Sequence, residues 1–256
     1  MSVTGGREEA LEANPTPGPH IVVVREGEFD EAVATSLAAA LRGAVGTASR
    51  NLTLAGGSTP RGGYEQLAER PDLPWGEVEV FFGDERAVPP DHPESNYRMV
   101  QESLLSRVPL SAGRIHRMEA DLPDREAAAR RYERILPDSL DLLVLGIGSD
   151  GHTASIFPDG EPVRERSRRV MRAEGPSPPR ERLTITSPVI LGARRIFVLA
   201  RGTGKASAVR RALEGPLDPV RCPAQLARNG MWILDEAAAG GLRLSMNGME
   251  KPWKSD

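Results

Sequence analysis

The sequence lacks long hydrophobic runs, an excess of basic residues and all but one cysteine. No stretch of its 256 residues approaches the roughly 18 consecutive apolar residues that a membrane helix needs. The formal net charge of -3 and the pI near 5.9 differ from the basic balance typical of nucleic-acid-binding domains. The lone Cys222 excludes an internal disulfide and a cysteine-rich metal site. We therefore expect no membrane partner and no nucleic-acid partner, and a small-molecule ligand instead.

The first twenty residues also lack the features of a secretory signal. They contain three Glu, three Pro and no apolar run, whereas a signal peptide has a basic start and an apolar middle. A cytoplasmic location is therefore expected. Residues 1–18 and 237–256 show no periodic apolar pattern, so we expect a flexible tail on each side of one domain spanning residues 19–236.

Apolar β-branched runs alternate with segments of helical period along most of the chain. This alternation is typical of an α/β fold with a mainly parallel sheet. Strands are expected at His20–Val24, Leu52–Ala55, Val78–Phe82, Asp141–Leu145, Arg182–Thr186, Ile196–Ala200 and Met231–Leu234. Helices are expected at Pro60–Glu69, Asn96–Leu105, Asp124–Leu136 and Gly204–Leu213, and after the first strand, where Phe29, Val33, Leu37 and Leu41 recur every four residues. Arginines and glutamates alternate over residues 161–174, which we interpret as a mixed-charge surface.

A glycine turn follows the second expected strand and leads into a helix. Gly56 and Gly57 allow a ligand to approach the backbone, while Ser58 and Thr59 offer hydroxyl groups and a helix cap. The helix start adds free N–H groups and a partial positive charge. The segment therefore predicts a phosphate-binding turn, although a capped turn without a ligand has the same pattern. It is not a Walker loop, because no Gly-Lys-Ser/Thr follows at the required spacing.

The third expected strand ends in charged residues. Asp84, Glu85 and Arg86 directly follow the apolar run that ends at Phe82. The forked donors of Arg86 suit an oxyanion, and the two carboxylates are able to orient that guanidinium or to bind sugar hydroxyls. An ion pair that only fixes the proline-rich loop after this strand is the structural alternative.

The fourth expected strand runs into a loop with the spacing G-x-G-x-x-G. Gly146, Gly148 and Gly151 form this pattern, which by itself suggests a dinucleotide site. We reject that interpretation, because Pro158 interrupts the helix that should follow and no acidic residue ends a second strand about 20 residues on. The glycines instead present Asp150 and His152 on a tight loop at the end of the strand.

Of the four histidines, His152 has the setting that favours catalysis. It follows Gly151 directly and stands two positions after Asp150, so a carboxylate is able to orient the imidazole as a base near neutral pH. His20, His92 and His116 have no such companion and are interpreted as structural.

A second anion-binding element is expected after the sixth strand. Lys205 ends the sequence Gly-Thr-Gly-Lys at a helix start, where an ammonium group, amide donors and the helix dipole meet. A solvent-facing lysine is the alternative there. Arg182 opens the fifth expected strand, one strand earlier in the chain.

Together these segments resemble the glucosamine-6-phosphate isomerase/6-phosphogluconolactonase family. The resemblance rests on GGSTPRGGYEQL from Gly56, FFGDERAVPPDHPESNYRM from Phe81, DLLVLGIGSDGHTASIFPD from Asp141, RLTIT from Arg182, GTGK ending at Lys205 and MWILD near the C-terminus. It covers roughly residues 21–235. It implies a single Rossmann-like three-layer α/β domain, similar to glucosamine-6-phosphate deaminase and ribose-5-phosphate isomerase. It also implies a metal-independent enzyme without a cofactor, a monomer or weak dimer, that opens 6-phosphogluconolactone in the oxidative pentose phosphate pathway.

The resemblance also implies roles for individual residues. His152 matches the general base, with Asp150 as its orienting partner, and Arg86 matches a residue at the substrate. Gly56, Gly57, Ser58, Thr59, Asp84, Arg182 and Lys205 match the substrate-binding positions, several of them around the phosphate.

Two other functions are consistent with the same fold. A sugar-phosphate isomerase or deaminase would use Asp84 as a base, but the related deaminases resemble this chain except for a tyrosine where Arg86 stands. A non-catalytic sugar-phosphate sensor would carry a DNA-binding helix-turn-helix, for which the segment before Ile21 is too short. A nucleotide-dependent dehydrogenase ranks last.

Overall fold

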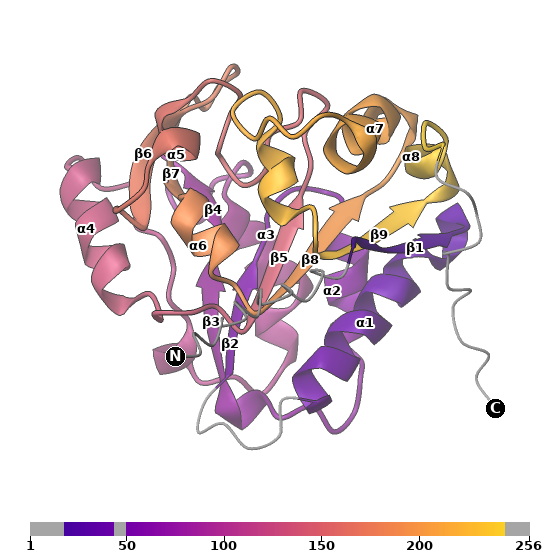
Figure 1. Ribbon diagram of the computed structural model, residues 1–256. Helices are drawn as coiled ribbons and strands as arrows, with labels where there is room; N and C mark the ends of the chain where they lie inside the picture. The colour runs from indigo at the N-terminus through magenta and orange to yellow at the C-terminus, as the bar shows by residue number, and fades with distance from the viewer. Residues whose placement is uncertain (1–17, 44–49, 244–256) are drawn as a thin grey trace, which may run out of the picture.

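A six-stranded parallel sheet forms the centre of the computed structural model, which describes residues 18–43 and 50–243 (Figure 1). Its strands lie in the order β1-β9-β8-β5-β2-β3. Their bounds are His20–Val24 for β1, Arg50–Leu54 for β2, Val78–Phe82 for β3, Leu142–Gly146 for β5, Arg195–Ala200 for β8 and Met231–Asp235 for β9. Every ladder in this sheet is parallel. The strands are buried over most of their length, as expected for a sheet covered on both faces.

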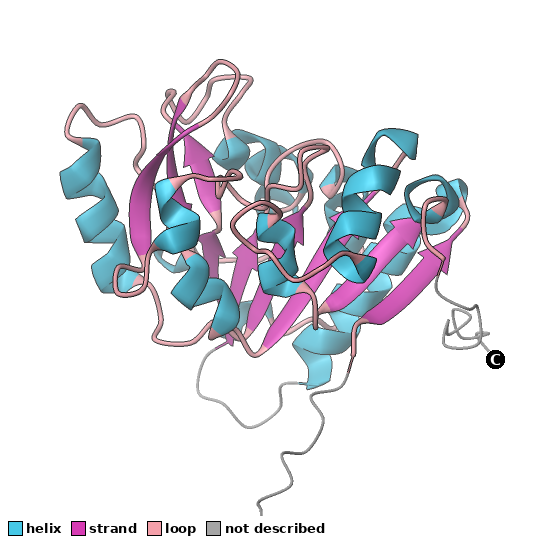
Figure 2. Cartoon of the chain, turned by 45° about the horizontal axis from the view of Figure 1, so that its top comes forward, coloured by secondary structure: helices cyan, strands magenta, loops and turns pink. Residues whose placement is uncertain are grey.

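Helices cover both faces of this sheet, which gives the expected three-layer α/β arrangement (Figure 2). The helices are α1 Phe29–Gly43, α2 Arg61–Ala68, α3 Asn96–Ser103, α4 Arg125–Ile135, α5 Glu161–Arg164, α6 Ser187–Leu191, α7 Ala206–Glu214 and α8 Glu236–Ala239. The apolar face predicted for α1 is buried, because Phe29, Val33, Leu37 and Leu41 are each 0% exposed. None of the helices in the described ranges has the length and apolar character that crossing a membrane requires.

A second, antiparallel sheet of three strands stands beside the first, in the order β4-β7-β6. It consists of β4 Asp84–Arg86, β7 Glu181–Ile185 and β6 Val170–Glu174. The expectation that the strand at residues 182–186 joins the main sheet is wrong, because that strand pairs with β4 and β6. The mixed-charge stretch also contains β6, in which Val170 is buried while Arg172 and Glu174 are exposed.

The connections of the large sheet run in two opposite directions across it. The path β1 to β2 to β3 moves toward one edge, and the path β5 to β8 to β9 moves toward the other. Because crossovers between parallel strands are right-handed, helices on the two paths lie on opposite faces. The adjacent strands β2 and β5 pair only at Leu52–Leu142 and Thr53–Leu143. A crevice is therefore expected beyond the carboxyl ends of these two strands, where open α/β sheets bind their ligands.

The described residues extend past position 236, where the domain was expected to end. Helix α8 spans Glu236–Ala239, and the side chain of Ala238 is 0% exposed. Of the expected tails, 1–18 and 237–256, residues 1–17 and 244–256 lie outside the described residues.

Candidate active site

A cavity of about 240 Å³ lies at the carboxyl ends of the central strands and is called the site cavity below. Of the residues predicted for the site, all except Asp150 line it: Gly56, Gly57, Ser58, Thr59, Asp84, Arg86, His152, Arg182 and Lys205. Asp150 contacts the His152 ring instead. The structure therefore brings together groups that are spread over 150 residues of sequence, because each follows or faces the end of a strand.

The Asp150 carboxylate fixes the orientation of the His152 imidazole. Oδ1 of Asp150 lies 2.6 Å from Nδ1 of His152 and accepts a hydrogen bond from the His152 backbone N–H at 3.0 Å. Burial by itself raises the pKa of Asp150, but these bonds to His152 outweigh it and lower the pKa to about 2. An ionised carboxylate only accepts hydrogen bonds, so Nδ1 of a neutral imidazole carries the hydrogen and the free lone pair is on Nε2.

The glycines of this loop have a geometric purpose. Gly151 has φ +94°, a conformation that L side chains rarely adopt. A Cβ atom on Gly148 would fall 2.1 Å from Nδ1 of His152, so any side chain there would displace the imidazole. The Gly148 N–H donates to the His152 carbonyl at 2.9 Å, which closes the loop. The close approach at Gly148 and the positive φ of Gly151 thus account for two of the three glycines without a dinucleotide.

The glycine turn after β2 faces the same cavity. Gly57 has φ +86°, and α2 begins at Arg61 with Pro60 as its N-cap. The expectation that a side chain of this turn caps the helix is wrong, because the N-cap of α2 is a proline without a side-chain hydrogen bond. The hydroxyls of Ser58 and Thr59 line the cavity instead, next to the helix start.

Lys205 reaches the cavity from a short 3-10 helix, Thr203–Lys205, that precedes α7. The turn before it is held by Asp235, which is 1% exposed. Its carboxylate accepts from the Gly202 N–H at 3.0 and 2.9 Å and from the Ala238 N–H at 2.7 Å. Asp235 is a supporting residue that the sequence did not reveal, although it ends the MWILD segment.

Two arginines line the cavity from the small sheet. Arg86 and Arg182 are directly opposite partners in the β4–β7 ladder. In the part of the chain that the structure describes, the buried Nε atom of each has no hydrogen-bond partner. Nη1 of Arg86 donates to the carbonyl of Glu94 at 2.7 Å. Burial lowers the pKa of Arg182, and the charge of Asp84 partly opposes this. Two opposed cations with unused donors favour an anion between them.

The carboxylates after β3 have different surroundings from those expected. Glu85 does not orient the Arg86 guanidinium. It is buried and accepts from two backbone N–H groups at the start of α3, those of Asn96 and Tyr97, and from the backbone N–H of Arg86. Burial raises the pKa of Glu85, and those donors oppose the rise. Asp84 accepts from Nδ2 of Asn96 at 3.1 Å and from Oγ of Ser155 at 2.5 Å.

Asn96 and Ser155 are polar residues of the site that the sequence analysis gave no role. Asn96 lines the cavity and is 1% exposed, while Ser155 is 0% exposed. Each stands within a motif quoted above, but which carboxylate it contacts depends on how the chain packs. Within the described residues, no three His, Cys, Asp or Glu side chains gather in the way that a metal ion requires.

Residues 25–234 match the family model of glucosamine-6-phosphate isomerases/6-phosphogluconolactonase. The chain belongs to this family. A 6-phosphogluconolactonase of Streptomyces coelicolor is 37% identical over 252 residues, which cover 89% of this chain and 96% of that protein. Membership of the family agrees with the resemblance seen in the motifs.

Solved structures of this family share the fold. The crystal structure of a 6-phosphogluconolactonase from Thermotoga maritima has a TM-score of 0.75 and 29% sequence identity, covering 85% of this chain and 99% of that one. A monomeric glucosamine-6-phosphate deaminase has a TM-score of 0.77 at 24% identity, covering 87% and 100%. At that identity the deaminase shows the fold alone.

Proposed function

We propose that this chain hydrolyses 6-phospho-D-glucono-1,5-lactone to 6-phospho-D-gluconate in the oxidative pentose phosphate pathway. The observation that carries the proposal is the Asp150–His152 pair, held at 2.6 Å beside a cavity that also presents Lys205, Arg86 and Arg182. One oriented base next to several cations suits an ester that carries a phosphate. The family and its lactonase relatives support the same activity.

In the proposed mechanism, cationic and hydroxyl groups hold the substrate while His152 activates water. Ser58, Thr59 and Lys205 bind the phosphate, aided by N–H groups near the start of α2. Nε2 of His152 removes a proton from water, and the resulting hydroxide adds to the C1 carbonyl. The C1 oxygen becomes negatively charged, and the Arg86 guanidinium stabilises this charge.

Ring opening completes the reaction. The tetrahedral intermediate collapses by breaking the bond between C1 and the ring oxygen, which leaves as an alkoxide. The His152 imidazolium returns its proton to that oxygen, so the base is regenerated and the acid product is formed. Asp150 remains ionised throughout and stabilises the imidazolium.

The environment of Asp84 does not favour the isomerase or deaminase alternative. Both of its carboxylate oxygens accept hydrogen bonds, from Asn96 and from Ser155. These bonds hold the carboxylate in the wall of the cavity, whereas the base of an enediol path must be directed at the substrate carbon. Asp84 instead supports the wall of the site cavity.

The decisive experiment follows purified protein with freshly generated 6-phosphogluconolactone against the spontaneous hydrolysis rate. We expect acceleration well above background, and no ammonia release from glucosamine 6-phosphate. Ammonia release without lactone hydrolysis would instead identify a deaminase. The cytoplasmic location, the absence of a nucleic-acid partner and the monomeric or weakly dimeric state stay predictions.

A further inference from the structure

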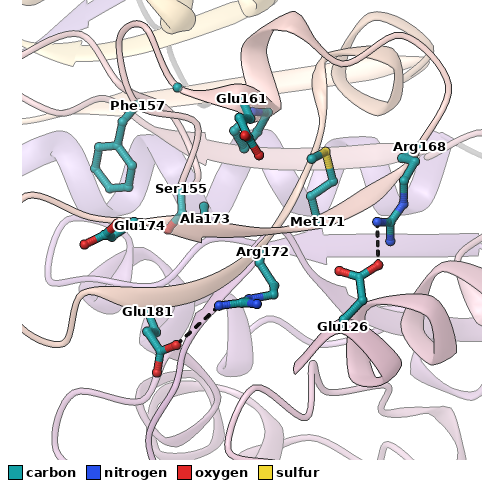
Figure 3. Close-up of a pocket in the computed structure, with 12 residues that line it drawn as sticks. Glu126, Ser155, Phe157, Glu161, Arg168, Met171, Arg172, Ala173, Glu174 and Glu181 are labelled. Carbon is teal, nitrogen blue, oxygen red and sulfur yellow. Dashed lines mark hydrogen bonds and ion pairs between the residues drawn. The ribbon is translucent and has the colours of Figure 1, made fainter. Parts of the chain in front are cut away.

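A second cavity, of about 780 Å³, adjoins the site cavity and is called the large cavity below. Its lining includes Phe157 and Ser155 at one end, together with residues of α4, α5, β6 and β7 (Figure 3). The side chains that these two residues contact, Asp84, His152 and Arg182, line the site cavity instead. Ser155 donates to Asp84, and the Phe157 ring contacts both His152 and Arg182. Phe157 therefore stands between the two cavities.

The Phe157 ring contacts the proposed base and a cationic group of the site at once. Its centroid lies 4.7 Å from that of the His152 ring, with an interplanar angle of 48°. Cζ of Arg182 lies 5.8 Å from the same centroid. Both distances are in the range in which aromatic and cation–π contacts are attractive. One side chain thus links the orientation of the imidazole to the position of the guanidinium.

Backbone contacts fix the position of this ring. The Asp159 N–H donates to the Val220 carbonyl at 2.8 Å, and the Gly160 N–H donates to the Phe157 carbonyl at 3.1 Å. A Cβ atom on Gly175 would lie 3.3 Å from Cζ of Phe157 and 2.8 Å from Nε of Arg182. The β6–β7 loop therefore closes over the phenyl ring and the guanidinium together, with no room for a side chain.

General core packing does not account for Phe157. The residue belongs neither to the buried hydrophobic cluster nor to the apolar residues packed against it, whereas Phe29, Phe81, Phe82 and Phe197 all belong to the cluster. Its ring contacts are with two side chains of the site.

We propose that Phe157 is a positioning residue for lactone hydrolysis, which holds the His152 imidazole and the Arg182 guanidinium in their relative places. The proposal rests on the proposed function. Through His152 the ring affects turnover, and through Arg182 it affects the binding of the anionic substrate and product. Substitution of a residue with a purely structural role would change the stability of the fold without separate effects on turnover and on binding.

The test is a double-mutant cycle with Phe157→Leu and Arg182→Gln, read out by lactone kinetics and by the calorimetric Kd of 6-phosphogluconate. We expect Phe157→Leu to raise Kd by about 3- to 10-fold and to lower kcat by a similar factor. In the Arg182→Gln background the leucine substitution should leave Kd unchanged while it still lowers kcat, because the guanidinium contact is already lost.

Phe197→Leu is the matched control, since Phe197 is buried in β8 and lines neither cavity. It should lower the melting temperature and leave kcat and Kd within about twofold of wild type. Should Phe157→Leu not fold, Phe157→Met replaces it in the cycle, because methionine fills the space without an aromatic face.

Two results overturn the proposal while the proposed function stands. One is wild-type kcat and Kd in Phe157→Leu, and the other is an increase in Kd that is as large in the Arg182→Gln background as in wild type. A wild-type chain that neither accelerates lactone hydrolysis nor binds 6-phosphogluconate overturns the proposed function, and the role of Phe157 falls with it.

Discussion

Arg86 and Arg182 stand directly opposite each other on β4 and β7, and both line the site cavity. Like charges that face each other across an antiparallel pair destabilise it. The arrangement is explained if a bound anion neutralises the two guanidiniums. The bound ligand then stabilises the folded chain in two ways, by its contacts with Lys205 and by removing the repulsion between the two guanidiniums.

We expect Arg182→Gln to weaken 6-phosphogluconate binding by about 10-fold or more, since it removes a charged donor from the anion. Saturating ligand should also raise the melting temperature less in this variant than in wild type. Thermal denaturation with and without the ligand measures both effects. Arg180→Gln is the control on the same hairpin, because Arg180 is exposed and pairs with Glu174. An equal ligand effect in all three proteins contradicts the assignment.

His152→Ala should lower kcat by about 100-fold or more, because the water loses its base. Binding of 6-phosphogluconate should stay within about threefold of wild type, since the anion-binding groups are unchanged. Steady-state kinetics corrected for spontaneous hydrolysis measure kcat, and calorimetry measures the binding of 6-phosphogluconate. Undiminished hydrolysis by the alanine variant refutes the role of His152.

Asp150→Asn should lower kcat, and the factor of the loss should be the same at every pH between about 5 and about 9. The reason is that a pKa of about 2 keeps Asp150 ionised over that whole range. The same pKa lies below its ordinary value of 3.8, so the carboxylate stabilises the folded state above about pH 3.8. That contribution is lost as the pH falls toward 2. Urea denaturation near pH 6 and near pH 2.5 should therefore show the stability advantage of wild type over the variant shrinking at low pH.

Gly148→Ala should abolish most activity by displacing the imidazole, since its Cβ atom would lie 2.1 Å from Nδ1 of His152 and 2.5 Å from Oδ1 of Asp150. We expect kcat to fall by about 100-fold, as for the loss of the base itself. Gly113→Ala is the control, because a Cβ atom there meets only Oγ of Ser111 at 3.9 Å. Kinetics and circular dichroism separate a misplaced base from a misfolded chain, and normal activity in Gly148→Ala speaks against the geometry.

Asp235→Ala should leave the N–H groups of Gly202 and Ala238 without their acceptor. Unpaired buried donors cost about 1–3 kcal/mol each, so the free energy of unfolding should fall. The turn that carries Lys205 also loses its anchor, and KM for the lactone should rise. Asp235→Asn keeps one acceptor oxygen, so its free energy of unfolding and its KM should lie between those of wild type and Asp235→Ala. A KM equal to that of wild type would show that Lys205 is positioned independently.

The sequence predicted most of the large sheet, and nine of the ten residues predicted for the site line the site cavity. Strands such as Val78–Phe82 are short apolar runs, and α1 has a regular fourfold pattern, so local periodicity was sufficient to recognise them. The small sheet was not predicted because β4 has three residues and β6 carries alternating charges. Such segments become strands only when a neighbouring strand supplies the hydrogen bonds, and for β4 that partner is the distant β7.

The sequence by itself indicated which groups the proposed chemistry uses and that each stands near the end of a strand, because residue type and local period are properties of short segments. The tertiary structure alone decided how these groups meet. It separates β2 from β5 beyond Thr53 and Leu143, sets Arg86 opposite Arg182 and places Phe157 against Arg182. These contacts depend on the pairing and packing of segments distant in sequence, which no local pattern records.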